Sequence, residues 1–254
     1  MGDGLNGKVA FITGAGQGIG QGIAFSLAKR GVSVVAVGRT LSKCENTVRL
    51  IQERFGQEAL AIGADITDLD QLPSLIEQTI AGFGRLDILV NNAVSATIKP
   101  LLKLTQDDIH RAMMSGPTAT LLLMQAAYPH LSKQGGSIVN MASSAAKRWD
   151  MTNYGLYAAE KEAIRALTRT AASEWGGDNI RSNCILPHAK SPALEWWTQN
   201  RPEEAAAFVK TIPMQRIGEC EEDIGEFVAM LCSDQSRYIN GQSIAVDGGQ
   251  AYMG

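Results

Sequence analysis

The chain has 254 residues, of which 45% are hydrophobic and 19% charged, and its formal net charge is −3 at pH 7. This composition is typical of a soluble globular protein and excludes a disordered chain. No run of Lys or Arg provides the basic face that a nucleic-acid partner needs, and no apolar run approaches the roughly 18 residues of a membrane span.

Short apolar runs alternate with segments of helical spacing. The first run, residues 9–13, leads into a glycine-rich turn, and a helical pattern over 19–30 follows it and ends at Gly31. The other predicted strands are residues 32–37, 59–64, 86–90, 137–141, 181–186 and 243–246. The other predicted helices are residues 41–55, 69–83, 107–131 (interrupted at Gly116-Pro117) and 153–175.

This alternation predicts an α/β fold, with a doubly wound, Rossmann-type parallel sheet flanked by helices on both faces. No linker, composition shift or repeat interrupts the pattern, so we expect a single domain over residues 1–254. Ligands of such sheets bind beyond the C-terminal ends of the strands, where the strand order reverses. The motifs described below all fall at that edge.

Four cysteines are scattered along the chain, at Cys44, Cys184, Cys220 and Cys232. With no Cys-x-x-Cys and no His at ligand spacing, we expect reduced thiols and no metal site. Residues 1–8 lack the apolar segment of a secretory signal, and Asn6 stands where a myristoylation motif needs Ser or Thr. We therefore expect a cytoplasmic protein with no membrane attachment.

The turn after the first strand contains Gly14, Gly18 and Gly20, together with Gln17 and Ile19. Glycines allow a tight turn and a close approach of the backbone to phosphates, and the helix N-terminus that follows favours an anion. Such turns also arise for steric reasons alone, but the placement between a strand and a helix favours a dinucleotide site.

The end of the second strand bears on the choice of cofactor. An acid usually stands there when the cofactor is NAD, whereas this strand ends at Gly38-Arg39, and a cation suits a 2′-phosphate. We therefore favour NADP(H). NAD(H) stays an alternative, because Arg39 would also suit a role that only stacks on the adenine, and because the uncharged Gln17 adds no second cation. The residues expected to border the adenine or the ribose at later strand ends are Asp65, Ile66, Asn91, Asn92 and Ala93.

Tyr157 and Lys161 are four residues apart on a predicted helix and share one face. A phenol with the ordinary pKa of about 10 is a poor proton carrier at neutral pH, and a nearby ammonium group lowers that pKa. The spacing alone is also common for a surface lysine beside a core tyrosine. Ser143 and Ser144 at the preceding strand end favour catalysis, because a serine there can donate to a carbonyl oxygen while Tyr157 supplies the proton.

Together these motifs resemble the classical short-chain dehydrogenases/reductases over essentially the whole chain. The matching residues are Thr13-Gly14-x-x-x-Gly18-Ile19-Gly20, Asp65, Asn91-Asn92-Ala93, Ser143 or Ser144, Tyr157-x-x-x-Lys161, Pro187 and Val246-Asp247-Gly248-Gly249. The resemblance implies a single Rossmann-type domain with a cofactor half at about 1–140 and a catalytic and lid part at about 141–254. It also implies an NAD(P)-dependent oxidoreductase that interconverts an alcohol and a ketone on a small-molecule substrate, and a homo-oligomer, tetramer or dimer.

Carried over from the family, Tyr157 is the acid/base, Lys161 binds ribose and lowers the pKa of the tyrosine, and a serine polarises the carbonyl. Counting along the strand from Gly136 selects Ser143 for this role, whereas a gap of thirteen residues to Tyr157 selects Ser144. We favour Ser143, because a loop varies in length more easily than a strand.

The chain departs from the family pattern at several positions. Gly116 stands where the family has an Asn that helps hold a water near the lysine, so we expect activity with an altered proton relay. Val94 replaces a glycine, and Pro187 is followed by His188 instead of Gly. Ser191 remains as a residue that can meet the nicotinamide amide.

Residues 190–218 are expected to form a lid over the substrate. Aromatic and Met side chains in this segment, and in the loop before Tyr157, favour a bulky apolar or cyclic substrate. The candidate substrate contacts are Ser144, Trp149, His188, Trp196 and Trp197. An equally weighted alternative is that the aromatic residues pack the lid onto the body or onto a second subunit, and for His188 a turn or lid role is favoured.

Two other functions fit parts of the sequence. A nucleotide-binding scaffold or sensor with little turnover would tolerate Gly116 and Val94. A related lyase or epimerase would use the same tyrosine with a bound nicotinamide.

Overall fold

The computed structural model describes residues 2–148 and 152–253, and within them seven strands form one parallel sheet. The strands are β1 (Val9–Thr13), β2 (Ser33–Gly38), β3 (Ala59–Gly63), β4 (Ile88–Asn91), β5 (Gly136–Met141), β6 (Ile180–Pro187) and β7 (Ser243–Val246). Their order is β3-β2-β1-β4-β5-β6-β7. The chain therefore winds outward from β1 to β3 and returns to β4 beside β1, where the order reverses.

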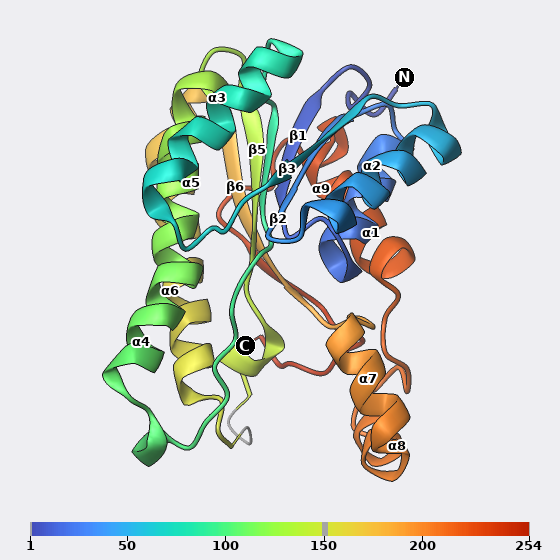
Figure 1. The fold of residues 1–254 in the computed structure, drawn as a ribbon, viewed down its shortest axis with the longest axis vertical. Helices are drawn as coiled ribbons and strands as arrows, with labels where there is room; N and C mark the ends of the chain where they lie inside the picture. Colours follow the sequence, from blue (N-terminus) through green and yellow to red (C-terminus); the bar gives the residue numbers. More distant parts are fainter. Residues whose placement is uncertain (1, 149–151, 254) are drawn as a thin grey trace.

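Helices cover both faces of this sheet (Figure 1). On one face lie α1 (Gly18–Ala28), α2 (Leu41–Phe55) and α9 (Glu226–Cys232), and on the other α3 (Leu72–Phe83), α5 (Ala119–Leu131) and α6 (Gly155–Trp175). Helix α4 (Gln106–Met113) precedes α5, and α7 (Pro192–Asn200) and α8 (Pro202–Val209) stand beyond the C-terminal ends of the strands. The fold is the doubly wound α/β class that the sequence predicted.

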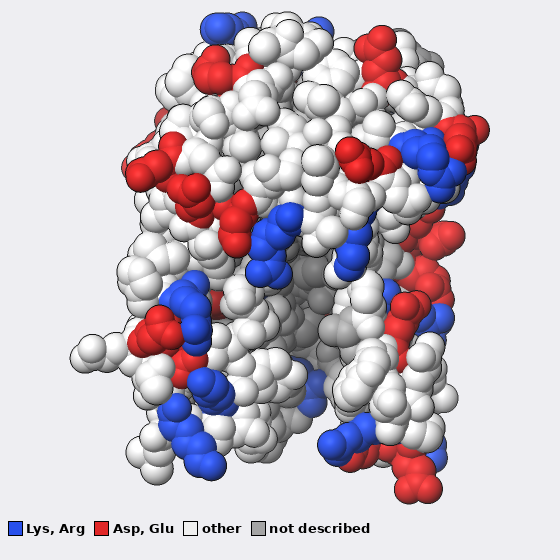
Figure 2. Space-filling view, in the orientation of Figure 1, with Lys and Arg blue, Asp and Glu red and all other residues white. Residues whose placement is uncertain are grey.

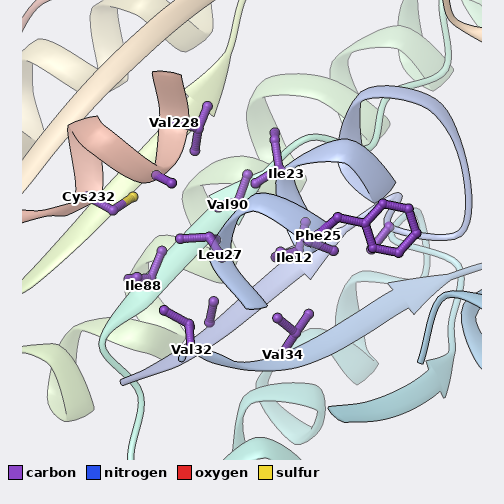
Figure 3. Packing of buried hydrophobic residues seen from close by; sticks show 14 of the residues in the cluster. Ile12, Ile23, Phe25, Leu27, Val32, Val34, Ile88, Val90, Val228 and Cys232 are labelled. Carbon is purple, nitrogen blue, oxygen red and sulfur yellow. The ribbon is translucent and has the colours of Figure 1, made fainter. Parts of the chain in front are cut away.

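Two apolar layers form because neighbouring residues of a strand point to opposite faces of the sheet. Ile12 of β1 packs with Ile23 and Leu27 of α1 and with Val228 of α9, as Figure 3 shows. The adjacent Phe11 points to the opposite layer, which α3 and α5 cover. Burial on both faces explains why the central strands are continuous apolar runs in the sequence.

The predicted elements are present, and the bounds of β1 and α2 coincide with those expected. The predicted interruption at Gly116-Pro117 is a π-helical turn, Met114–Thr118, that joins α4 to α5. Helices α7, α8 and α9 were not predicted: residues 190–218, which contain α7 and α8, were assigned only as a lid, and no element was assigned to the residues of α9.

Helix α1 carries the glycine turn at its start, and glycines set its position against the π-helical turn Cys220–Gly225. A Cβ on Gly22 would lie 2.3 Å from the carbonyl oxygen of Cys220. A Cβ on Gly225 would lie 2.4 Å from the carbonyl oxygen of Gly22. The two backbones are therefore in direct contact, and neither glycine can carry a side chain without a backbone shift.

We expect Gly22→Ala to lower the free energy of unfolding by about 1–3 kcal/mol, because the π-helical turn has to move. Helix propensity alone would predict the opposite, a gain of about 0.5–1 kcal/mol. Gly82→Ala in α3 is the matched control, because a Cβ there would have Leu60 Cδ2 as its nearest neighbour, at 3.7 Å. Thermal unfolding should show a lower Tm for Gly22→Ala alone, and equal Tm values for the two variants would contradict the packing argument.

Candidate active site

The C-terminal ends of strands β1 to β6 enclose a cleft of about 560 Å³. Figure 2 shows the molecule hollowed between the side that carries α4 and α6 and the side that carries α7 and α8. The predicted site residues that line the cleft are Gly14, Gln17, Gly18, Ile19, Arg39, Asp65, Ile66, Asn92, Ala93, Ser143, Tyr157, Lys161, Pro187 and Ser191.

Some predicted residues lie elsewhere. Gly20 lies beneath the turn, where a Cβ would be 2.4 Å from the carbonyl oxygen of Gly14. The Asn91 side chain is buried in the sheet and donates to Asn140 Oδ1 at 2.8 Å, because residues of β4 alternate in direction. Its neighbour Asn92 lines the cleft instead. Trp149 falls outside the described residues.

Thr13 fastens the end of β1 to the end of β4. Its Oγ1 accepts hydrogen bonds from the backbone N–H groups of Asn92, at 2.9 Å, and Ala93, at 3.0 Å. The Asn92 side chain donates in return to the carbonyl oxygen of Thr13 at 2.9 Å. Gly14 then turns with φ +68°, and a Cβ on it would lie 2.6 Å from Asn92 Nδ2. These hydrogen bonds fix the backbone at the edge of the cleft, between β1 and β4, where the strand order reverses.

Helices α1 and α2 both begin at the cleft with N-termini that no side chain caps. Gln17, at the start of α1, accepts a hydrogen bond from Lys43 Nζ at 2.5 Å. Lys43 and Arg39 both line the cleft. Free N–H groups, helix dipoles, two cations and glycines with no Cβ in the way fit the phosphates of a dinucleotide. Sequence reasoning missed Lys43, although its place one turn after Arg39 at the start of a predicted helix was a usable signal.

The three groups predicted for catalysis meet on the wall of the cleft. The Ser143 side chain lies beside Tyr157 and lowers the pKa of its hydroxyl. Lys161 Nζ lies 5.5 Å from the centre of the Tyr157 ring. Lys161 is 2% exposed and donates to the carbonyl oxygen of Met141 at 2.9 Å. The end of β5 and the first two turns of α6 thus supply all three groups.

Burial sets the acid–base properties of this wall. It raises the pKa of Tyr157 to about 12, a rise that the Ser143 side chain opposes. It lowers the pKa of Lys161, because an ammonium group loses its hydration there. With a pKa of about 12, Tyr157 keeps its proton at neutral pH and is suited to donate it.

Ser144, the other candidate serine, is turned away from the cleft and is 4% exposed. Its Oγ donates to Asp247 Oδ2 at 2.7 Å, and the Asp247 carboxylate also accepts backbone N–H groups of residues 249–251. Ser144 therefore anchors the C-terminal segment, and the hydroxyl that reaches Tyr157 is that of Ser143.

The lid is attached to the body by an aromatic cluster. Phe208 of α8 contacts His188 edge-to-face at 5.4 Å and Trp197 of α7 at 5.6 Å. Burial lowers the pKa of His188, so the ring is neutral at pH 7. Trp196 points outward and is 63% exposed. Ser191 accepts from the Leu194 N–H at 3.4 Å and caps α7. His188 and Trp197 thus pack the lid, as one of the two sequence-based alternatives proposed.

Within residues 2–148 and 152–253, no group of three or more His, Cys, Asp or Glu side chains is placed to hold a metal ion. No helix in this part of the chain combines the length and the apolar character that a membrane crossing requires.

A protein family described as enoyl-(acyl carrier protein) reductase matches residues 14–251. The chain is 37% identical over 252 residues to a 12α-hydroxysteroid dehydrogenase of Clostridium sp., which covers 96% of this chain and 97% of that protein. A solved 7α-hydroxysteroid dehydrogenase, complexed with NADH and 7-oxoglycochenodeoxycholic acid, superposes with a TM-score of 0.91 at 35% identity, covering 98% of this chain and 96% of that one. L-sorbose reductase from Gluconobacter frateurii, complexed with NADPH and L-sorbose, gives a TM-score of 0.90 at 29% identity, covering 98% of each chain.

The two serines can be separated by substitution. We expect Ser143→Ala to reduce turnover by about 10²–10³-fold, because a donor to the reacting oxygen is lost. Ser144→Ala should retain turnover and lose about 1–3 kcal/mol of unfolding free energy, because a buried hydrogen bond of Asp247 is removed. Steady-state rates and Tm values of both variants test this, and a Ser144→Ala variant that lost turnover with an unchanged Tm would reverse the assignment.

Proposed function

This chain belongs to the short-chain dehydrogenase/reductase family, and we propose that it interconverts a secondary alcohol and a ketone on a bulky apolar or cyclic substrate, with Tyr157 as the acid/base and NADP(H) as the preferred cofactor. At the level of the family it is an NAD(P)-dependent alcohol dehydrogenase or ketone reductase. The observation that carries the proposal for Tyr157 is its contact with both Ser143 and Lys161 on the wall of the cleft.

The residues divide the proton chemistry among themselves. A bound nicotinamide supplies or accepts the hydride at the substrate carbon. In reduction, Ser143 donates a hydrogen bond to the carbonyl oxygen and Tyr157 gives it a proton; in oxidation, Tyr157 takes the proton back. Lys161 keeps a positive charge beside the phenol ring, and a positive charge there favours the phenolate. This effect opposes burial, which raises the pKa of Tyr157 to about 12.

The lid supports the proposed substrate class. Trp196 and Met214 are 63% and 61% exposed on residues 190–218, the segment that reaches the cleft through Ser191 and Pro192. Large apolar side chains left open beside a site favour an apolar ligand. The hydroxysteroid dehydrogenases among the relatives act on fused-ring alcohols by their names, whereas L-sorbose is a polar sugar, so a comparison of the two substrate types discriminates between them.

The preference for NADP(H) is proposed on two cations. Arg39 follows β2 and Lys43 lies in the first turn of α2, and both face the cleft near Gln17. The residue just after β2 is Arg39 and not an acid. The Asp65 carboxylate accepts hydrogen bonds from the backbone N–H and the hydroxyl of Thr67, at 3.0 and 2.9 Å. Two cations near an uncapped helix N-terminus suit the additional phosphate of NADP(H).

We also propose a homo-oligomer. Leu101 and Leu102, between β4 and α4, are 70% and 101% exposed, and Ile109 of α4 is 46% exposed. Exposed apolar side chains gathered on one side of a molecule favour association. Sedimentation analysis of the purified protein would measure the state directly.

Tyr157→Phe tests the acid/base assignment. Turnover of an identified substrate should fall by about 10²–10⁴-fold, because the phenol that transfers the proton is removed and the ring is kept. Tyr154→Phe is the matched control, since Tyr154 packs edge-to-face on Tyr157 at 6.0 Å and contributes no proton. Turnover rates are measured from nicotinamide absorbance, with both cofactors. The substrate panel contains alcohols and ketones of three kinds: steroids, other cyclic compounds and sugars.

An unchanged rate for Tyr157→Phe would refute the assignment. Cofactor binding with no turnover across the whole panel would favour a nucleotide-binding scaffold instead.

Substitutions at the two cations test the cofactor preference. We expect Arg39→Asp to weaken NADP(H) by roughly 10–100-fold and to favour NAD(H), because a charged contact to the phosphate is lost and a 2′-hydroxyl acceptor is gained. Lys43→Ala should weaken NADP(H) selectively as well. Arg49→Ala, farther along α2 and paired with Glu53, is the control. Equal losses of NADP(H) and NAD(H) affinity in fluorescence titrations would contradict the proposal.

A further inference from the structure

A second carboxyl group lies buried on α6, directly before Lys161. Glu160 is 0% exposed, and neither of its carboxylate oxygens has a hydrogen-bond partner among the described residues. A buried carboxylate without donors is unfavourable, because nothing replaces its hydration. Packing alone does not account for an acid at this position, since an apolar side chain of similar size would fill the space without that cost.

The Glu160 carboxyl group packs on the π-helical turn Met114–Thr118. A Cβ on Gly116 would lie 3.4 Å from Glu160 Oε2 and 3.6 Å from Glu160 Cδ. A Cβ at position 116 would thus meet the carboxyl group at ordinary van der Waals distance, and a side chain that extends farther would compete with it for space. The adjacent Ser115 lines the cofactor cleft, and its buried Oγ also has no partner among the described residues. The acid thus lies behind the wall of the cleft, one residue from its surface.

The charge of Glu160 acts on both members of the catalytic pair. A negative charge on Glu160 raises the pKa of Lys161 and that of Tyr157. Burial raises the pKa of Glu160 itself, and the Lys161 ammonium group opposes that rise. The three groups therefore titrate as a linked set, and the state of one alters the other two.

Neighbouring elements contribute few other charges to this set. The π-helical turn has no ionisable side chain. The last turn of α4 contributes His110 and Arg111, both exposed. On β6, the Cys184 thiol faces Lys161, and burial raises the pKa of Cys184 to about 11, so it is neutral at pH 7. The Glu160 carboxylate is therefore the main negative charge felt by Lys161.

We propose that Glu160 is a positioning residue of the active site, whose carboxylate holds the protons of Lys161 and Tyr157 and so sets the pH range in which Tyr157 transfers a proton. This inference rests on the proposed function, in which Tyr157 carries the proton. Gly116 and Glu160 are a matched pair, in which the carboxyl group packs against a position that carries no side chain.

The Glu160→Gln variant tests the coupling, because it keeps the volume of the side chain and removes its charge. Lys161 and Tyr157 then both release protons more easily, so the pH profile of turnover moves to lower pH by about 1 unit, in oxidation and in reduction alike. Glu162→Gln is the control, because this side chain is 43% exposed and paired with Arg165. A Glu160→Gln profile that coincides with that of the wild type overturns the proposal.

A second measurement needs no substrate and remains valid if the proposed function fails. A carboxyl group whose pKa is raised by folding contributes stability at low pH and loses it as the pH rises through the raised value. Glutamine does not ionise. The Tm of Glu160→Gln relative to the wild type should therefore be higher at about pH 9 than at about pH 5. A Tm difference that does not change with pH shows that Glu160 does not titrate in its buried site, and overturns the proposal.

The spatial match is tested by a double-mutant cycle. Gly116→Asn alone should lower both Tm and turnover, because the new side chain meets the Glu160 carboxyl group. Combining Gly116→Asn with Glu160→Ala should recover part of both losses, because the space is then free. Strictly additive effects would show that the two positions are not a matched pair.

Discussion

Lys161 carries its ammonium group into the interior, where it donates to the carbonyl oxygen of Met141 at 2.9 Å. Met141 is the last residue of β5, and Ser143 follows two positions later. The contact between β5 and α6 that accommodates the buried cation therefore also brings the serine to the Tyr157 hydroxyl. A buried ammonium group is costly in free energy. Here it lies 5.5 Å from the centre of the Tyr157 ring, and the proposed chemistry depends on this arrangement.

The parallel sheet places these groups beside the nucleotide cradle. Because the order of the strands reverses between β1 and β4, no connection crosses the gap above them, and the bonds of Thr13 to residues 92–93 hold that gap in shape. Helices α1 and α2 aim their N-termini at the same opening. The glycine turn and these N-termini would hold the phosphates of a dinucleotide in the cleft that Tyr157 also lines. The lid, held by Phe208 between His188 and Trp197, borders the remaining side.

Much of the fold was predictable, because buried parallel strands are recorded as continuous apolar runs and long helices as periodic ones. The bounds of β1 and α2 followed from this pattern alone. Helices α7 and α8 did not, because they form the lid beyond the sheet and bury few side chains, so no continuous apolar face marks them in the sequence. At the site, motifs predicted Tyr157 and Lys161, and both line the cleft.

The direction of individual side chains depended on backbone geometry that the sequence does not record. Asn92 was distinguished from Asn91 only by the structure. Ser143 was favoured from the sequence, but the partner of Ser144, Asp247, is seen only in the structure. Glu160 escaped notice because an acid on a long helix is ordinarily a solvent-exposed residue, and only its burial over Gly116 identifies it.

Hydride transfer to a carbonyl carbon, with the proton from Tyr157, is the central step of the proposed function. It is tested most directly by incubating a cyclic ketone with a reduced cofactor deuterated at the transferring position and analysing the alcohol by mass spectrometry. One deuterium at the carbinol carbon, formed by the wild type and not by Tyr157→Phe, is the predicted result; deuterium transfer that is undiminished in Tyr157→Phe would contradict it.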